Sequence, residues 1–447
     1  MPARRLSLSM LAAAAAATLL SSGDSHGQTA AAAVQVSRPA GQVVLPQSSL
    51  ARPEIPERLA RTHLQIFVPE ATTSIAPGAG FFETPASVAC VMGLVVVTDG
   101  CNPQVVTTTA GKGSHAIAVV DAYDYSSSAS SDLATFSSQF GLPAPTASNF
   151  QVIYGTGNPS SGCVNGPQPP SASGTGWDLE ESVDIEWAHA LAPLATIYLV
   201  EANSNSFTDL FNAIAVATAC VHAVGEGEVS MSWGSGDFAG ETSYDSSFTG
   251  SNSVAYFASA GDSPGVNYPA SSPNVVGIGG TSFSRNPSTG AFQGQVAWYS
   301  TGGGPSPNET RPAFQNGLAA IVGSQRGTPD ASALADPNTG AWVYNSTYYG
   351  SGSWIVVGGT SVATPIVAAI VNRAGFFWGS APNALTNIYQ IAGSSQYGNY
   401  FFDVNNGYCG GTYEPFLPAY TESNYATPWD FCTGWGSPQG SHHQTVE

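Results

Sequence analysis

Short apolar runs alternate with longer amphipathic segments along the chain from residue 115 onward. Short runs rich in β-branched residues favour buried strands, whereas apolar residues three or four positions apart favour helices with one buried face. The expected strands are 116–120, 151–154, 196–200, 254–257 and 354–357, and the expected helices are 131–140, 176–193, 207–223 and 365–373. This alternation predicts a doubly wound α/β fold, with helices on both faces of one mostly parallel sheet.

A serine lies at the junction of the last expected strand and helix, in the sequence Gly358-Gly359-Thr360-Ser361. The glycine pair allows a tight turn without side-chain clashes. The serine is then close to a helix N-terminus, where the partial positive charge stabilises a developing anion. These features indicate a nucleophile at Ser361, and the alternative is a serine that only caps the helix.

The expected helix 176–193 carries two carboxyl residues, Glu180 and Asp184, four positions apart. On a helix they share one face, within reach of a shared proton. Neighbouring like charges separate the pKa values of two carboxyls, so that one stays basic while the other holds a proton. Apolar residues on several sides indicate burial, and a solvated acidic face is the alternative.

Asp262 follows the expected strand 254–257, in the sequence Ala260-Gly261-Asp262-Ser263. The carboxyl end of a parallel strand borders the crevice where α/β sheets bind ligands. Asp262 is therefore a candidate site residue, and an ordinary turn is the alternative.

Together these segments resemble, in the same order, the sedolisin family of serine-carboxyl peptidases. The resemblance covers residue 115 to the C-terminus. It rests on Glu180 and Asp184, Ser232-Trp233-Gly234, Ala260-Gly261-Asp262-Ser263, Gly302-Gly303-Gly304, Pro329-Asp330 and Gly358-Gly359-Thr360-Ser361. It implies a subtilisin-like α/β fold and a serine-type endopeptidase that hydrolyses proteins at acidic pH through an acyl-enzyme.

The resemblance also implies a role for each site residue. Ser361 is the nucleophile, Glu180 its general base, Asp184 the group that orients and charges Glu180, and Asp262 the oxyanion donor. The substrate cleft would be lined by Ser232, Trp233 and Gly234. Asp121, at the end of the first strand, either supports the carboxyl pair, as an acid does in some relatives, or is a turn residue.

A glutamate base suits a serine protease that works in acid. Histidine protonates near neutral pH and then cannot accept the serine proton, whereas the reference pKa of glutamate lies about two units lower. Asp262 must hold a proton to donate a hydrogen bond, which acid also favours. We therefore expect activity to peak at roughly pH 3 to 5, where carboxyls titrate.

Two other functions remain open at this stage. One is a secreted binding homologue that has lost proteolysis, and the other is an esterase or transacylase that uses the same serine. The scattered histidines offer no subtilisin-type triad, and the chain has no His-Glu-x-x-His or Cys-x-x-Cys spacing for zinc.

A calcium site is implied near the C-terminus. Members of the family bind calcium through two aspartates and backbone carbonyls, and the matching positions here are Asp403, Val404, Ala426, Pro428 and Asp430. Calcium takes six to eight oxygens, so backbone carbonyls must supply much of the shell. The fixed φ of a proline limits how the loop wraps the ion, and the alternative is a loop tied only by a disulfide.

Composition excludes one class of partner. The chain has 11 Lys and Arg against 30 Asp and Glu, a formal net charge of -19 and only one lysine, Lys112. Nucleic-acid binding through a basic patch is therefore excluded. The expected partners are protein or peptide substrates of a monomeric enzyme.

The N-terminus predicts export. Arg4 and Arg5 precede an apolar stretch, 6–20, and small residues follow to residue 33, as in a secretory signal peptide. We expect a signal peptide at 1–33, an N-terminal extension at 34–113, and a peptidase domain at 114–447, secreted outside the cell or to the periplasm and free of the membrane. The extension is too short for the large prosegment of the family, so it is a remnant or pH alone controls the enzyme.

Six cysteines agree with an oxidising compartment. Fifteen pairings are possible in principle. Proximity along the sequence favours Cys90 with Cys101, Cys163 with Cys220, and Cys409 with Cys432, and free buried thiols are the alternative.

Overall fold

The computed structural model describes residues 39–50, 58–70, 75–249, 253–350, 352–375, 381–409 and 428–440. The expected signal peptide, 1–33, lies outside these residues. Contacts place residues 34–447 in one compact unit. Within the described ranges, no helix is both long and apolar enough to cross a membrane.

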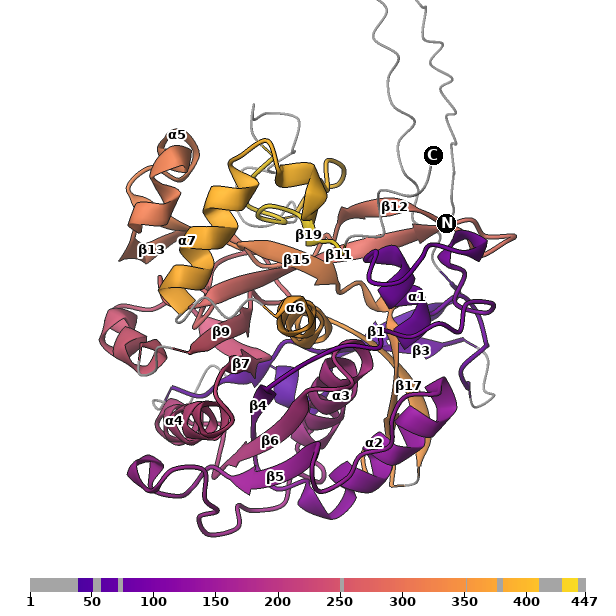
Figure 1. The fold of residues 1–447 in the computed structure, drawn as a ribbon, viewed down its shortest axis with the longest axis horizontal. Coiled ribbons are helices and arrows are strands. Elements are labelled where there is room, and N and C mark those ends of the chain that lie inside the picture. Colours follow the sequence, from indigo (N-terminus) through magenta and orange to yellow (C-terminus); the bar gives the residue numbers. More distant parts are fainter. Residues whose placement is uncertain are drawn as a thin grey trace, which may run out of the picture. The chain divides into compact units, whose positions relative to one another are not determined.

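An eight-stranded sheet forms the centre of the described structure (Figure 1). Its strands pair in parallel, except that β12 is antiparallel to β11. β15 also pairs in parallel with β11, off the main path of the sheet. In spatial order the strands are β12 (Phe292–Ala297), β11 (Val276–Arg285), β9 (Val254–Ser259), β7 (Gly227–Met231), β4 (Ala116–Ala122), β6 (Thr196–Ala202) and β5 (Phe150–Tyr154), with β15 (Ala331–Leu334). The predicted mostly parallel sheet is confirmed.

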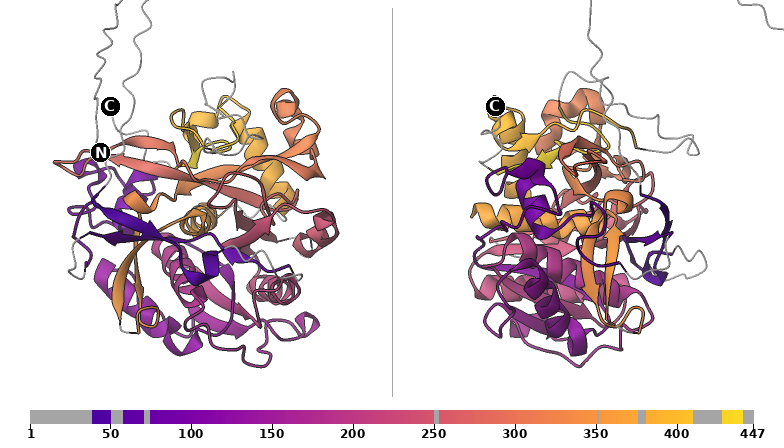
Figure 2. Two further views of the ribbon diagram at one scale, coloured as in Figure 1. Left: turned by 180° about the vertical axis from the view of Figure 1, so that it is seen from behind. Right: turned by 90° about the vertical axis from the view of Figure 1, so that its right-hand side faces the viewer.

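Helices cover both faces of this sheet, as predicted (Figures 1 and 2). On one face α3 packs against α6 and β4, and on the other α4 packs against β4, β6 and β7. The helices are α1 (Pro85–Val91), α2 (Ser126–Phe140), α3 (Trp177–Leu191), α4 (Phe207–Ala223), α5 (Ala319–Val322), α6 (Thr360–Ala374) and α7 (Ala381–Ala392). Short 3₁₀ helices occur at η1 (Gln47–Ser49), η2 (Asp99–Cys101), η3 (Pro159–Ser161), η4 (Glu241–Phe248), η5 (Ala313–Leu318), η6 (Pro337–Thr339) and η7 (Tyr397–Asn399).

The strand before the serine does not join the main sheet. It belongs to a separate antiparallel sheet, in the order β1-β3-β17-β16, that includes two strands from the N-terminal extension. These strands are β1 (Gly41–Val44), β3 (Gln65–Pro69), β17 (Ser353–Gly358) and β16 (Ala341–Asn345). We expected the alternating strands and helices to belong to one sheet as far as Ser361. This expectation is wrong for β17, because β17 pairs with the N-terminal strand β3 instead of with the main sheet.

Three smaller sheets complete the described structure. One of them has the order β10-β8-β2 and brings another piece of the N-terminal extension to the main body. The strands of the three sheets are β2 (Arg61–Thr62), β8 (Trp233–Gly236), β10 (Asn267–Tyr268), β13 (Gly304–Thr310), β14 (Gln325–Thr328), β18 (Phe401–Phe402) and β19 (Ser437–Pro438).

Two helices begin five residues earlier than predicted. The helix α2 begins at Ser126 because a run of serines, which gives no apolar signal, forms its first turn. The helix α6 begins at Thr360, so that Pro365 lies inside it. A proline interrupts the pattern by which a helix is recognised, although the backbone continues through it.

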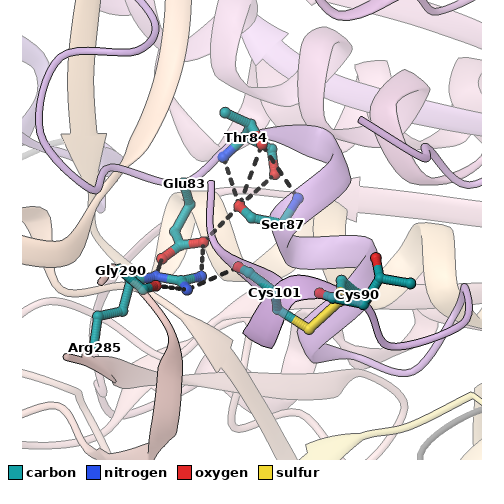
Figure 3. Close-up of a disulfide and its surroundings, with 8 residues drawn as sticks. Glu83, Thr84, Ser87, Cys90, Cys101, Arg285 and Gly290 are labelled. Carbon is teal, nitrogen blue, oxygen red and sulfur yellow. Dashed lines mark hydrogen bonds and ion pairs between the residues drawn. A yellow bond between two sulfur atoms is a disulfide. The ribbon is translucent and has the colours of Figure 1, made fainter. Parts of the chain in front are cut away.

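The three predicted disulfides are confirmed, and no cysteine is free. The Cys90–Cys101 disulfide lies beside a buried ion pair between Glu83 and Arg285 (Figure 3). Both Nε and Nη2 of Arg285 lie 2.5 Å from the carboxylate of Glu83, and Nη1 donates to the carbonyl of Cys101 at 2.8 Å. The pair therefore fastens the segment around α1 to the end of β11.

Removal of the Arg285 side chain is expected to destabilise the protein strongly. The variant Arg285→Met leaves Glu83 buried without its cation, which typically costs about 3–5 kcal/mol. Urea unfolding in a Ser361→Ala background measures the loss, and Arg311→Met, at a half-buried position, is the control. Addition of Glu83→Gln to Arg285→Met should recover part of the loss, and equal stability of Arg285→Met and the parent would contradict the prediction.

Candidate active site

The helix α3 holds the two carboxyl residues of the acidic segment inside the protein. Every residue of α3 is buried, and neither Glu180 nor Asp184 has exposed surface. The reason is that α3 packs against α6, α2 and β4. A solvated acidic face is therefore excluded.

Ser361 lies in the first turn of α6, just after β17, and is buried. The hydroxyl donates to the carbonyl of Ser232 at 2.9 Å and accepts from the backbone N–H of His63 at 3.1 Å. The N-cap of α6 is Gly359, so the role of an N-cap for Ser361 is also excluded. Gly359 has a φ of 109°, which a residue with a side chain rarely adopts.

Ser232 connects the serine to the carboxyl pair. Its hydroxyl donates to Oδ1 of Asp184 at 2.7 Å, while its carbonyl accepts from the hydroxyl of Ser361. The Ser232 hydroxyl also lies 3.2 Å from the carbonyl oxygen of Ser361. That oxygen is free of its helical partner because Pro365, four residues on, has no N–H.

Asp262 lies beside the same turn, beyond the end of β9. Its Oδ1 accepts from the N–H and the hydroxyl of Thr360, at 2.8 and 3.0 Å. Its Oδ2 is buried and has no hydrogen-bond partner among the described residues. Burial raises the pKa of Asp262 to about 7, although the hydrogen bonds from Thr360 oppose the shift. Below that pH the carboxyl holds a proton that it can donate.

A cluster of carboxyls surrounds Glu180. Burial raises the pKa of Glu180 and of Asp184 well above the ordinary values, and the charge of Asp121 raises both further. Burial also raises the pKa of Asp121 to about 8, and both of its oxygens lack partners in the part of the chain described. Mutual repulsion makes the first ionisation of such a cluster easier than the next, so one carboxyl is charged while its neighbours hold protons.

Glu180 is near the serine but not engaged with it. The Ser361 hydroxyl lies close enough to lower the pKa of Glu180. However, the hydroxyl proton points to Ser232, and neither oxygen of Glu180 has a hydrogen-bond partner within the described ranges. Rotation of the hydroxyl toward Glu180 would form the pair of a nucleophile and its base.

Of the three residues expected to line the cleft, Ser232 immediately precedes β8, and Trp233 and Gly234 are the first two residues of that strand. The indole of Trp233 is fully buried and donates to the carbonyl of Val120 at 2.7 Å. This side chain therefore packs into the core beside β4 and has no surface to offer a substrate. The backbones of Trp233 and Gly234 pair with Thr62 and Arg61 in β2. The edge of β8 therefore faces the N-terminal extension.

The expected calcium ligands are only partly described. Asp403, Val404, Pro428 and Asp430 lie within the described ranges, whereas Ala426 lies outside them. In the part of the chain that the structure describes, no group of three or more His, Cys, Asp or Glu side chains is placed to hold a metal. Two carboxylates would leave most of a calcium shell to carbonyl oxygens.

The carboxylate of Asp430 already has partners in its own turn. Its Oδ1 accepts from the N–H groups of Cys432 and Thr433 at 2.6 and 2.9 Å, and its Oδ2 accepts from the Thr433 hydroxyl at 2.9 Å. These bonds shape the turn between the Cys409–Cys432 disulfide and β19.

Sequence reasoning missed the contribution of residues 61–63. The backbone N–H of His63 donates to the hydroxyl of Ser361, and the carbonyl of His63 accepts from the backbone N–H of Ser361. The two residues are 298 positions apart in the sequence. The available signal was a short mixed apolar segment within a Pro- and Ala-rich extension. That segment had the pattern of a strand, but its partner could not be read from it.

No family model matches the chain, but comparison with individual known proteins finds relatives. It is similar to sedolisin of Pseudomonas sp. (strain 101), with 33% identity over 196 residues, which are 40% of this chain and 29% of the relative. It is also similar to kumamolisin of Bacillus sp. (strain MN-32), with 31% identity over 340 residues, which are 69% of this chain and 56% of the relative. The matched region thus spans about half or less of each of these relatives.

One solved structure supports the fold. The structure described as Pseudomonas sedolisin, a serine-carboxyl proteinase, complexed with two molecules of pseudo-iodotyrostatin, has 24% sequence identity and a TM-score of 0.56. The match covers 80% of this chain and 96% of that one. The subtilisin-like α/β architecture predicted from the sequence is therefore confirmed.

Proposed function

The chain belongs to the sedolisin family of serine-carboxyl peptidases, and from this membership we propose that it is an endopeptidase that hydrolyses proteins at acidic pH through an acyl-enzyme on Ser361. One observation carries the proposal. Ser232 accepts from the Ser361 hydroxyl and donates to Asp184, so the serine and the carboxyl pair meet at one residue.

In the proposed reaction Ser361 attacks the carbonyl carbon of the substrate and passes its proton to Glu180. Glu180 must be the ionised member of the pair to accept this proton, and Asp184 then holds the proton of the pair on Oδ2 while its Oδ1 accepts from the hydroxyl of Ser232. Glu180 then protonates the leaving amine, and water hydrolyses the resulting ester. The N–H of Ser361 and protonated Asp262 would donate to the oxyanion.

Two ionisations bound the expected pH range. Activity requires one negative charge in the cluster of Glu180, Asp184 and Asp121, so it should rise with pH through the first ionisation of that cluster. It also requires the proton on Asp262, whose pKa of about 7 sets the upper limit. Because burial raises the pKa values of the cluster, the structure favours the upper part of the acidic range.

A pH profile of casein cleavage tests the proposed function. We expect a bell that falls near pH 7, and Asp262→Asn should lower the peak but move the falling limb to higher pH, because an amide donates at any pH. Loss of one oxyanion donor typically lowers turnover on the order of 100-fold to 1000-fold. Cleavage of ester substrates without cleavage of casein would show an esterase, and no hydrolysis at any pH would show a binding homologue.

We also infer that the protein is exported and that its N-terminal 33 residues are a signal peptide. The three disulfides support this inference, because disulfides persist in oxidising compartments. The substrates would then be proteins or peptides outside the cytoplasm.

Calcium is proposed as a structural ligand near Asp403 and Asp430. If it is bound, a chelator such as EGTA should lower the melting temperature of the Ser361→Ala protein, and excess calcium should restore it. Asp403→Asn should abolish the response to chelator. Melting curves that overlay with and without EGTA would show that the hydrogen-bonded turn at Asp430 is sufficient without an ion.

A further inference from the structure

A second group of buried carboxyls adjoins the candidate active site. Glu181 follows Glu180 on α3, and Glu201 lies on β6 directly opposite Asp121 of β4. Paired residues of neighbouring strands point to the same face of a sheet. The charges of Asp121 and Glu201 both act on Glu181, so the shared face is the one that α3 covers. Neither Glu181 nor Glu201 has exposed surface, and the proposed reaction uses neither of them.

Glu181 is the central member of this group. Both of its oxygens are buried, and neither has a hydrogen-bond partner in the part of the chain that the structure describes. Burial raises its pKa well above the ordinary value, and the charges of neighbouring carboxyls raise it further. These neighbours are Glu201, Asp121, Asp178 and Asp124. Glu181 therefore holds a proton at acidic pH. A protonated carboxyl is both a donor and an acceptor, so it can take a proton from one neighbour and give one to another.

Glu201 joins this group to the surface. Burial raises the pKa of Glu201 to about 9. Burial also opposes the ionisation of Asp124, but hydrogen bonds, one of them from Glu201, outweigh it and lower the pKa of Asp124. Glu201 is thus the protonated member of this pair, and because its Oε1 accepts from the N–H of Tyr125 at 2.9 Å, Oε2 holds the proton. Asp124 is half-buried and accepts from the exposed Gln168 at 2.6 Å, so its carboxylate can exchange protons with solvent.

The proposed reaction needs a second proton in each turnover. The leaving amine takes the hydroxyl proton of Ser361 through Glu180. In acid it departs as an ammonium ion, because the pKa of an α-amino group is about 8. The ammonium ion carries one proton more than the serine supplied, and this proton comes from the catalytic cluster of Glu180, Asp184 and Asp121. None of these three carboxyls has exposed surface, so a replacement proton from solvent needs a route through the protein.

We propose that Glu181 and Glu201 form a proton path that links the catalytic cluster to the surface at Asp124. This proposal rests on the proposed function and adds two residues to its reaction. Both act through other carboxyls and touch no substrate, so they are positioning residues and not catalytic ones.

The path replaces the proton that leaves with the amine. Asp121 passes a proton to the other two members of the cluster and takes one from Glu181. Glu181 takes a proton from Glu201, Glu201 takes one from Asp124, and Asp124 takes one from solvent. Each carboxyl of the path ends with as many protons as it had at the start. The net change is that one proton moves from solvent to the ammonium product.

The test compares a peptide that the enzyme cuts from casein with the methyl ester of its acyl portion. Methanol leaves with the serine proton alone, whereas the amine takes a second proton, so only peptide hydrolysis draws on the path. Glu181→Gln and Glu201→Gln keep the shape of a protonated carboxyl, but an amide does not ionise and interrupts the path. At about pH 4, where carboxyls titrate, each variant should lower kcat for the peptide on the order of 100-fold. Each should leave kcat for the ester within about threefold of the parent.

Glu228→Gln is the matched control. Glu228 is buried on β7 opposite Ile117, four residues before Asp121, and its Oε2 accepts from Nδ2 of Asn372 at 2.8 Å. Its substitution should leave both rates within about threefold of the parent. Melting curves establish that each variant is folded, and if one variant does not fold, the other decides.

Two results would overturn the proton path. One is an equal loss for peptide and ester, which would show that the two glutamates only support the structure. The other is a peptide rate that neither variant changes. In both cases the parent still hydrolyses casein and the proposed function stands, whereas a parent that leaves casein intact would contradict the proposed function itself.

Discussion

Replacement of Glu180 with glutamine is expected to lower kcat nearly as far as replacement of Ser361 with alanine, by roughly 10⁴-fold to 10⁶-fold. Glutamine keeps the size of the side chain but cannot accept the serine proton, so the nucleophile stays inactive. Both variants should fold, because glutamine matches the protonated form that burial already favours at Glu180. Casein cleavage at the optimum pH, with melting curves of each variant, measures the effect.

Glu186→Gln is the matched control for this prediction. Glu186 is also buried on α3, but its Oε2 accepts from the backbone N–H of Tyr344 at 3.0 Å, on the side of the second sheet. We expect its substitution to leave kcat within about threefold of the parent. Full activity of Glu180→Gln would show that another group takes the proton of Ser361.

The second large effect is a loss of stability as the pH rises from about 4 to about 8. Burial raises the pKa to about 8 for Asp121, about 9 for Glu201 and about 7 for Asp262. Since the folded state holds these protons more tightly than the unfolded state, their contribution is complete below the ordinary carboxyl pKa and is lost as pH rises toward the folded values. For Asp262 alone the shift corresponds to on the order of 4 kcal/mol.

Melting of the Ser361→Ala protein at a series of pH values measures this loss without self-digestion. We expect the melting temperature to fall by more than about 10 °C over that range. Asp121→Asn should flatten the dependence, because the amide does not ionise, while Glu70→Gln at an exposed carboxyl should leave it unchanged. A melting temperature that is constant or rises from about pH 4 to 8 would contradict the prediction.

The sequence was sufficient for features that depend on local pattern. The helix 207–223 was predicted with the bounds of α4, because its apolar spacing is uninterrupted. Cysteine spacing predicted the three disulfides, and the order of short motifs led to Ser361, Glu180, Asp184 and Asp262, which the fold brings together. Where local signal was absent or interrupted, as at the serines that begin α2 and at Pro365, the predicted helices began late.

By itself, the sequence determined which residue types are available for chemistry and which segments form strands and helices, because periodicity and motif order are properties of neighbouring residues. Only the tertiary structure decided that β3 pairs with β17, that α3 is buried on every side, and that the backbone of His63 lies on Ser361. Strand pairing and burial depend on surfaces contributed by distant segments, and no local pattern encodes a contact across 298 positions. The same burial sets the pKa values of the carboxyl cluster, which composition alone would place near their ordinary values.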